Sequence, residues 1–260
     1  MRWIRFTAEA KTAYGILEGQ NIVEVKGDPF SGHERTGRVH ALEAVRVELP
    51  VIPPTFYAAG RNYAAHTIKA GHQVPTKPDI GYRANNALIA HNEPVIIPYD
   101  ASEKVVYEGE LVVVIGKKAK RVSEAEALDC VLGYTIGNDI SERTWQYMDQ
   151  TFWRSKNTDT FKPMGPWIET DVNLDSMETI IRLNGKEQIR FPTNDMVFGI
   201  ATYISAMSHN LTLYPGDVIW MGTDGGSPNL KDGDVVEIEI TGIGTLRNQF
   251  IAEVVADAPG

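Results

Sequence analysis

The chain has 260 residues, a formal net charge of −9 and a hydrophobic fraction of 43%, which suits one large domain or a large domain with a small one. The acidic charge argues against nucleic acid and against an anionic membrane as partners, because both attract a basic surface. No apolar run approaches the roughly 18 residues of a membrane span, and the single Cys130 excludes an internal disulfide, so a cytoplasmic protein is expected.

Short segments of alternating polar and apolar residues make up the N-terminal part of the chain. Turn-forming residues separate these segments, which is typical of strands joined by tight turns. The prolines of Val51-Ile52-Pro53-Pro54 then fix the backbone in an extended connector. We therefore predict a small β-rich N-terminal subdomain over residues 1–52 and a larger domain over residues 53–260.

Strands outnumber short helices in the predicted elements of the larger domain. Apolar residues at helical spacing predict a helix over residues 196–207, a capping box starts another helix at Ser123, and Gly71 closes a third over residues 62–70. An Asn-Gly turn after residues 179–183 predicts a hairpin. Further strands are expected at residues 55–59, 107–116, 217–221 and 235–240. The predicted fold class is α+β with a β-rich core.

Two carboxylates interrupt the apolar strand predicted at residues 107–116. Side chains alternate along a strand, so Glu108 and Glu110 point to the same face, while Gly109 leaves room on the opposite face for another backbone. Neighbouring carboxylates on a largely apolar face repel each other and lose hydration. Either a divalent cation compensates them, or the polar half of an amphipathic strand reaches solvent.

Asp139 ends another predicted strand, in a bend that glycines punctuate. On its own it is an ordinary turn aspartate, but with Glu108 and Glu110 it would complete a site made of carboxylates alone. Oxygen ligands without Cys or His favour Mg²⁺ or Mn²⁺ over Zn²⁺. Such a site would leave room for water and for a chelating substrate.

The order and spacing of several blocks resemble the fumarylacetoacetate hydrolase family over about residues 53–252. The blocks are Gly60-Arg61-Asn62-Tyr63-Ala64-Ala65-His66, Tyr107-Glu108-Gly109-Glu110-Leu111, Gly137-Asn138-Asp139-Ile140-Ser141-Glu142-Arg143, Lys156, Pro163-Met164-Gly165-Pro166-Trp167, Asn184-Gly185 and Pro215-Gly216-Asp217. The resemblance implies a mixed β-roll or sandwich catalytic domain that is usually dimeric, so a homodimer is expected. It also implies a Mg²⁺ or Mn²⁺ site at Glu108, Glu110 and Asp139.

Several further residues match family positions that face the substrate. Lys156 resembles a lysine that would stabilise a developing enolate or carboxylate, and Thr223 resembles the threonine that binds the substrate carboxylate. A solvated surface charge and a turn residue are the respective alternatives. The resemblance implies supporting or substrate-binding roles for Arg143 and Gln146, and for Arg83, which stands where the family commonly has lysine.

The resemblance makes His66 the candidate lid histidine that activates water in the hydrolytic members. Those members usually carry a glutamate one helical turn later, and Lys69 stands there instead. A lysine cannot accept the imidazole proton and disfavours protonated histidine. Asp224 and Ile189 also stand where the family commonly has proline and glutamine. Either another carboxylate substitutes for the glutamate, or the chemistry does not require a His–Glu pair.

These residues predict a Mg²⁺- or Mn²⁺-dependent enzyme that acts on a small 2-oxo or 1,3-dicarbonyl acid through a metal-stabilised enolate. Lys156 and His66 are the expected catalytic residues, and closure of residues 62–86 would exclude solvent. The family resemblance favours C–C bond hydrolysis of the acylpyruvate or fumarylacetoacetate type. The lysine at position 69 instead favours β-oxo acid decarboxylation or keto–enol isomerisation. A protein that binds oxo acids without turnover is the non-enzymatic alternative.

Overall fold

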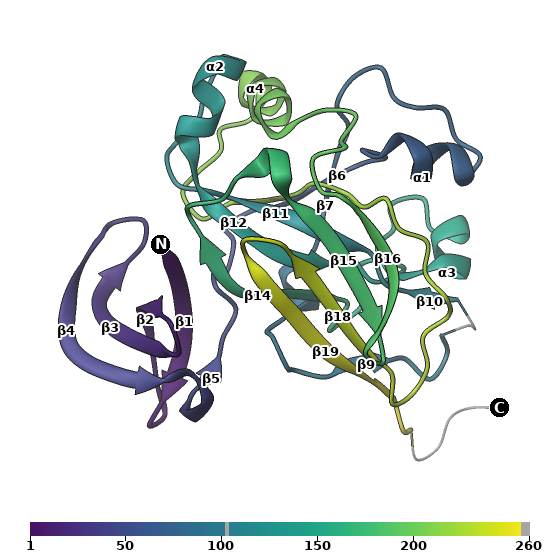
Figure 1. Ribbon diagram of the computed structural model, residues 1–260. Coiled ribbons are helices and arrows are strands. Elements are labelled where there is room, and N and C mark those ends of the chain that lie inside the picture. Colours follow the sequence, from purple (N-terminus) through teal and green to yellow (C-terminus); the bar gives the residue numbers. More distant parts are fainter. Residues whose placement is uncertain (102–103, 256–260) are drawn as a thin grey trace.

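The computed structural model describes residues 1–101 and 104–255, in which two sheets dominate (Figure 1). The neighbours within the larger sheet are antiparallel, except for two parallel pairs, β17 (Val218–Trp220) with β6 (Phe56–Ala59) and β14 (Lys162–Glu169) with β8 (Leu88–Ile89). Its strands follow the order β4 (Gly32–Ala41), β3 (Asn21–Asp28), β2 (Lys11–Glu18), β1 (Arg2–Ala8), β14 (Lys162–Glu169), β12 (Val131–Asn138), β11 (Gly109–Ile115), β17 (Val218–Trp220), β6 (Phe56–Ala59) and β7 (Ile80–Tyr82). Outside this order, β5 (Arg46–Val47) pairs with β1 and β8 (Leu88–Ile89) pairs with β14.

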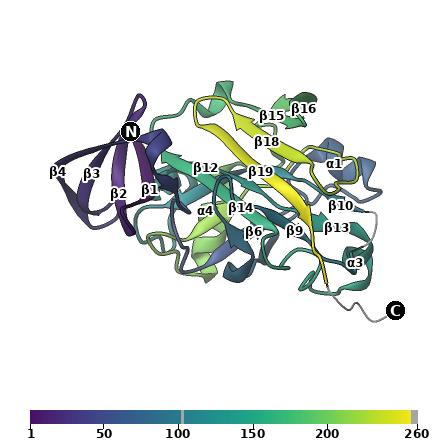
Figure 2. The same cartoon turned by 90° about the horizontal axis from the view of Figure 1, so that it is seen from below.

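Strands β1 to β4 form an antiparallel meander at one side of the molecule (Figure 2). Strand β1 connects the meander to the rest of the large sheet, because Trp3 pairs with Ile168 of β14. A separate small core fills the meander, formed by Ile4, Phe6, Leu17 and Ile22. The sequence does not predict β4, whose side chains are nearly all exposed and lack an apolar alternation.

The second sheet packs on the larger one. Its strands follow the order β16 (Lys186–Pro192), β15 (Glu178–Leu183), β18 (Val235–Ile240), β19 (Gly244–Ala252) and β9 (Val95–Ile97). Leu111 and Val113 of the larger sheet lie with Ile181 and Ile238 of the second in one buried cluster. A two-stranded pairing of β10 (Val105–Val106) with β13 (Ser141–Glu142) completes the β-structure of the described residues. The predicted β-rich fold class is confirmed.

Short helices connect the strands. The α-helices are α1 (Ala64–Lys69), α2 (Glu124–Ala127), α3 (Arg143–Met148) and α4 (Ile200–Asn210), and the 3₁₀-helices are η1 (Leu42–Ala44), η2 (Asn85–Ala87), η3 (Leu128–Cys130) and η4 (Leu174–Ser176). The capping box at Ser123 and the hairpin turn at Asn184-Gly185 are confirmed. Among the described residues, none of the helices has the length and apolar composition needed to cross a membrane.

Asn62 shortens two of the predicted helices. Its side-chain oxygen accepts the backbone N–H of Phe198 at 2.9 Å, and its backbone carbonyl accepts that of Val197 at 2.8 Å. These bonds hold the backbone before α4 outside the helix, so α4 begins at Ile200, and the predicted start at Met196 is wrong. The same hydrogen bonds hold Asn62 outside α1, which begins at Ala64.

Candidate active site and metal centre

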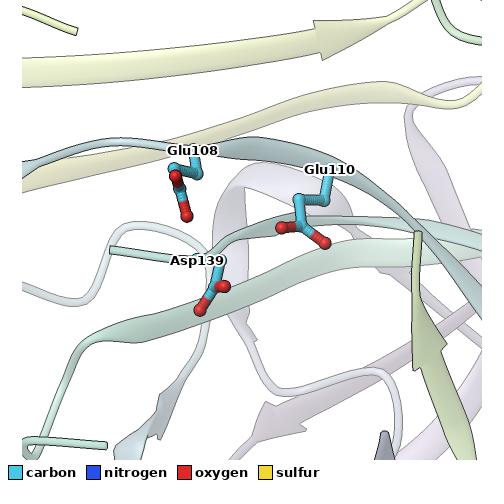
Figure 3. A group of neighbouring side chains, drawn as sticks. All are labelled: Glu108, Glu110 and Asp139. Carbon is cyan, nitrogen blue, oxygen red and sulfur yellow. The ribbon is translucent and has the colours of Figure 1, made fainter. Parts of the chain in front are cut away.

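The pairing of β11 with β12 brings the three predicted metal ligands together. Glu110 pairs with Gly137, so Glu108, just before β11, lies beside Asp139, just after β12. The backbone N–H of Asp139 donates to the carbonyl oxygen of Glu108 at 2.8 Å. One carboxylate oxygen from each of the three acids lies within 4.8 Å of the other two, and the carboxylates face a common space (Figure 3).

The three carboxylates are removed from solvent. Glu108, Glu110 and Asp139 are only 5%, 4% and 2% exposed. Val112 and Val114, which share the face of Glu110, pack in a second hydrophobic cluster. Strand β11 is buried along its whole length. The alternative in which this half of the strand reaches solvent is therefore wrong, and the negative charge requires compensation within the protein.

Gly109 makes room for side chains, whereas the sequence predicted a neighbouring backbone. A Cβ atom at this position would lie 2.8 Å from Ile181 Cδ1 and 2.9 Å from Ile238 Cγ2. The second sheet thus closes tightly over the back of the strand that carries Glu108 and Glu110. This packing fixes the strand while its other face is free to present the carboxylates.

Lys156 and Arg143 neutralise Glu108 directly. The Lys156 ammonium lies 2.6 Å from Glu108 Oε2 and 2.6 Å from Asp139 Oδ2, so it bridges two of the three acids. Arg143 Nη2 lies 2.5 Å from Glu108 Oε1, and its Nη1 donates to Gln146 at 2.6 Å. The structure therefore brings both predicted residues to the acid cluster, and the surface-charge alternative for Lys156 is excluded by its burial.

Arg83 and Lys162 neutralise Asp139. The Arg83 guanidinium forms a bidentate pair with Asp139, with N–O distances of 3.2 Å and 3.0 Å. Lys162 is fully buried and lies 2.9 Å from Asp139 Oδ1. Bidentate pairing of this kind fixes the plane of a carboxylate. In this arrangement Arg83 orients a candidate metal ligand, and its predicted contact with substrate stays a prediction.

These pairs hold two of the acids ionised. Burial alone would raise the pKa of Glu108, but Lys156 and Arg143 lower it to about 2. Burial likewise opposes ionisation of Asp139, yet attraction by Arg83 and Lys156 keeps its pKa well below the usual range. Two full negative charges are therefore present at neutral pH.

Glu110 has a different environment. Its carboxylate accepts the backbone N–H of Gly222 at 2.8 Å and has no ion pair among the described residues. Burial and repulsion by Asp139 and Glu108 raise its pKa to about 8. Within the described part of the chain, the negative charge of Glu110 is therefore not neutralised by an ion pair, in contrast to the charges of Glu108 and Asp139.

This donor set fits a hard divalent cation. Three buried carboxylates provide oxygen ligands without Cys or His, and the raised pKa of Glu110 marks where additional positive charge would be stabilising. Mg²⁺ and Mn²⁺ take such ligands together with waters or a chelating substrate. The residues present therefore agree with the cation that the sequence predicted.

Helix α1 carries His66 near the acid cluster. The imidazole is half-buried, and burial lowers its pKa, so it is neutral at physiological pH. No carboxylate binds this imidazole among the described residues. The Asp224 carboxylate instead accepts the backbone N–H of His66 at 3.1 Å. A substituting carboxylate is therefore present beside His66, but it binds the helix backbone.

Thr223 lies beside the Glu110 end of the acid cluster. It is buried directly after Gly222, whose N–H binds Glu110, and its hydroxyl accepts the N–H of Gly225 at 3.3 Å. Both the turn role and the substrate role predicted for Thr223 are compatible with this position. Its contact with substrate stays a prediction.

Sequence reasoning missed Lys162 as part of the site. It stands in a strand between Phe161 and Pro163, directly before a block that resembles the family. A lysine is almost never fully buried unless it is paired, so its place in an apolar strand was the available signal. The capping contact of Asp224 had no such signal, because it joins residues 158 positions apart.

Comparison with known sequences extends over nearly the whole chain. The family described as fumarylacetoacetate (FAA) hydrolase C-terminal matches residues 55–251, and the family described as Rv2993c-like, N-terminal matches residues 1–50. Protein Rv2993c of Mycobacterium tuberculosis is 40% identical over 261 residues, covering 96% of this chain and 98% of the relative.

Solved structures share the fold. A 5-carboxymethyl-2-hydroxymuconate delta-isomerase from Mycobacterium smegmatis superposes with a TM-score of 0.90 at 38% identity, covering 97% of this chain and 100% of that chain. A maleylpyruvate hydrolase from Sphingobium sp. SYK-6, solved with manganese(II) and pyruvate, superposes with a TM-score of 0.81 at 26% identity, covering 98% and 100%. Relatives of this fold therefore include both an isomerase and a hydrolase.

Proposed function

Because the chain belongs to the fumarylacetoacetate hydrolase family, we propose that it is a Mg²⁺- or Mn²⁺-dependent enzyme acting on a small 2-oxo or 1,3-dicarbonyl acid. The observation that carries this proposal is the buried trio of Glu108, Glu110 and Asp139, with the Lys156 ammonium 2.6 Å from two of them. The relative solved with manganese and pyruvate supports it, since pyruvate is a 2-oxo acid.

Each residue of the site has a defined task in this proposal. The trio would hold the cation, to which the 2-oxo acid group of the substrate would bind through two oxygens, and the cation would supply Lewis-acid chemistry there. Lys156 stabilises negative charge as it develops on the substrate oxygen. Arg83 fixes the orientation of Asp139, and the Thr223 hydroxyl donates to the substrate carboxylate.

C–C bond hydrolysis is the first candidate reaction. His66, unprotonated because burial lowers its pKa, takes a proton from water as the water oxygen adds to the distal carbonyl carbon. The bond between that carbon and its neighbour then breaks, and its electron pair remains on the 2-oxo acid fragment. Protonation of this fragment at carbon, by the proton that His66 holds, releases the 2-oxo acid and a carboxylic acid.

Decarboxylation of a β-oxo acid and keto–enol isomerisation form the second candidate. A specific observation favours them: Lys69 occupies the position of the usual glutamate, and the described residues provide no carboxylate for the His66 imidazole. Both reactions need the charge stabilisation that Lys156 provides, and neither requires an activated water.

A steady-state panel of acylpyruvates, oxaloacetate and enol tautomers, assayed with Mg²⁺, Mn²⁺ and EDTA, tests the proposal. If hydrolysis is the reaction, His66→Ala lowers kcat by about 100-fold or more, the usual contribution of a general base. Full turnover by His66→Ala would remove His66 from the chemistry, and turnover that EDTA leaves unchanged would refute the metal role. Binding of oxo acids without turnover of any panel member would favour the non-enzymatic alternative.

We also propose a cytoplasmic homodimer with an N-terminal domain over residues 1–52 and a catalytic domain over residues 53–260, of which residues 102–103 and 256–260 lie outside the described part. Exposed apolar side chains in and after α3 support a dimer, since Tyr147 and Met148 are 85% and 70% exposed. Light scattering should give a mass near twice 28.8 kDa, and a monomer would contradict this assembly.

A further inference from the structure

A cavity of about 470 Å³ lies where the N-terminal meander meets the rest of the molecule. One wall comes from the turn after β2, from η1 and from the segment through β5, and the other from the turn after β8 and from β14. Its lining residues are distinct from the acid cluster and from the basic residues that pair with that cluster. The cavity is therefore a second place with room for a small molecule, separate from the candidate active site.

Apolar side chains form part of the lining of this cavity. The Trp167 ring is held in place, because its Nε1 donates to the carbonyl oxygen of Ile243 at 2.7 Å. The other apolar lining residues are Leu42, Val45, Val47 and Pro166. An aromatic or aliphatic group of a ligand can pack against such a surface and lose its contact with water.

Opposite charges line the cavity from its two sides. Arg46 of β5 lies on the meander side, and Glu93 lies in the turn after β8. The Arg46 guanidinium contacts Glu48 through Nε and Nη2, so among the described residues its Nη1 has no partner. Glu93 Oε2 accepts the backbone N–H of Ala90 at 2.7 Å, and Oε1 is likewise without a partner in the described part of the chain. Both charged groups therefore keep bonding capacity for a ligand.

Arg46 and Glu93 attract each other across the cavity without direct contact. Attraction by Glu48 and, as a smaller contribution, by Glu93 raises the pKa of Arg46. No ion pair joins Arg46 to Glu93 within the described residues. Glu43 adds a second carboxylate on the meander side. A ligand that carries a positive and a negative group complements both kinds of charge at once.

His91 supplies a hydrogen-bond donor to the same cavity. Burial lowers the pKa of His91 to about 4, so the imidazole is neutral at physiological pH. Its Nδ1 accepts the backbone N–H of Arg247 at 3.1 Å, which places the ring proton on Nε2. Because His91 lines the cavity, this N–H can donate to an anionic group of a ligand there.

We infer that this cavity binds a zwitterionic α-amino acid with an apolar side chain. An α-amino acid carries both charges at neutral pH, on groups attached to one carbon. Its ammonium binds Glu93 and Glu43, and its carboxylate binds Arg46 and the His91 N–H. Its side chain packs on Trp167. Such a ligand joins the meander to the rest of the molecule, because each side supplies one of its charged partners.

Calorimetric titration of the full-length protein in EDTA tests this assignment, since EDTA removes cations that would bind carboxylate probes at the acid cluster. The probes are L-phenylalanine, 2-phenylethylamine and 3-phenylpropanoate, which share the ring and its two-carbon chain. The amine lacks the carboxylate, and the acid lacks the ammonium. We expect L-phenylalanine to bind about tenfold more tightly than either, the factor of one hydrogen bond to a charged group.

Two variants separate the two charges. Glu93→Gln keeps an oxygen acceptor for the Ala90 N–H, and it should remove most of the preference over 3-phenylpropanoate only. Arg46→Gln should remove most of the preference over 2-phenylethylamine only. Glu34→Gln and Arg35→Gln make the same changes at exposed positions of β4 and should keep both preferences.

Hydrogen exchange followed by mass spectrometry locates the bound ligand. L-Phenylalanine should slow exchange in residues 42–47 and 90–93, which line the cavity, and leave residues 107–116 unchanged. Equal affinities for the three probes, preferences that survive in both charge variants, or protection elsewhere would overturn the inference. No binding up to about 10 mM, a weak limit for a ligand of this size, would overturn it too. The test involves neither turnover nor Mg²⁺, so its result is independent of the proposed function.

Discussion

Single buried charges determine the geometry of the candidate site, and Lys162 is the clearest case. Its ammonium donates to the carbonyl oxygens of Ile140 and Phe161 at 2.8 Å and 2.9 Å, and it lies 2.9 Å from Asp139 Oδ1. Burial lowers its pKa to about 7, although Asp139 opposes that shift. All of its described contacts are with buried protein atoms, so its role is to hold the Asp139 carboxylate in place.

Lys162→Met should therefore destabilise the protein strongly. The change keeps most of the side-chain length but removes one of the three cations that pair with Asp139 and a buried donor to the carbonyl oxygens of Ile140 and Phe161, at an expected cost of about 3–5 kcal/mol. Urea unfolding followed by circular dichroism measures the free energy of unfolding. Lys26→Met, at an exposed lysine of β3, should change it by less than about 0.5 kcal/mol. Equal stability of the two variants would contradict the structural role of Lys162.

Glu24 in the N-terminal meander is a second buried charge, and it predicts a pH dependence. Its carboxylate is 7% exposed and accepts hydrogen bonds from Arg38 and His40. The bonds from Arg38 lower its pKa to about 2, from an ordinary value of 4.5. The stabilisation is therefore complete above about pH 4.5 and is lost as the pH falls towards 2.

Thermal unfolding of the wild type and of Glu24→Gln across pH measures this effect. The variant should unfold at a lower temperature at pH 6, and the difference should shrink steadily between pH 4.5 and 2 as Glu24 becomes protonated. The exposed Glu34 in the same meander provides the control Glu34→Gln. A difference that does not vary with pH would show that lost packing, not charge, causes the destabilisation.

Among the elements, α1 depends most on its surroundings. It has six residues and no side-chain cap of its own at Tyr63, and so short a helix is unstable in isolation. Asp224, from the loop after β17, provides the missing acceptor at the His66 N–H. The loop that carries Thr223 therefore also holds the helix that carries His66.

Asp224→Ala should loosen α1. Loss of a capping acceptor costs about 1 kcal/mol, which corresponds to roughly fivefold faster hydrogen exchange of the α1 amides. Mass-spectrometric hydrogen exchange over residues 62–71 measures it. Asp224→Asn keeps the oxygen acceptor and should remain close to wild type. Unchanged exchange in Asp224→Ala would show that other contacts hold the helix.

On the scale of the whole molecule, the two sheets share one core around the strand that bears Glu108 and Glu110. A cation held by carboxylates from two neighbouring strands would bind the folded chain only, because unfolding separates the ligands. Metal binding should therefore stabilise the whole fold through linkage.

Adding Mg²⁺ should raise the unfolding temperature. At one hundred times Kd the stabilisation is about 2.7 kcal/mol, which for a chain of this size means a rise of roughly 5–10 °C. Differential scanning calorimetry with Mg²⁺ or EDTA measures it. Glu110→Gln should lose the response, whereas Glu187→Gln, at an exposed position of β16, should keep it. An equal rise in both variants would place the cation elsewhere.

The sequence by itself determined the features that depend on short-range geometry. The two-residue period of a strand put Glu108 and Glu110 on one face, and the glycine-punctuated bend put Asp139 at the end of the next strand. The Asn184-Gly185 turn and the Ser123 capping box followed from local hydrogen bonding in the same way. Family resemblance then predicted the chemistry of the trio.

Only the tertiary structure decided which charges meet. The pairing of Lys162 and Arg83 with Asp139, and of Asp224 with His66, joins segments that no local pattern relates. The bonds from Asn62 to the segment before α4 overrode a helical period for the same reason. Chain geometry acts between near neighbours, whereas the compensation of a buried charge depends on whatever the completed fold brings within hydrogen-bond distance.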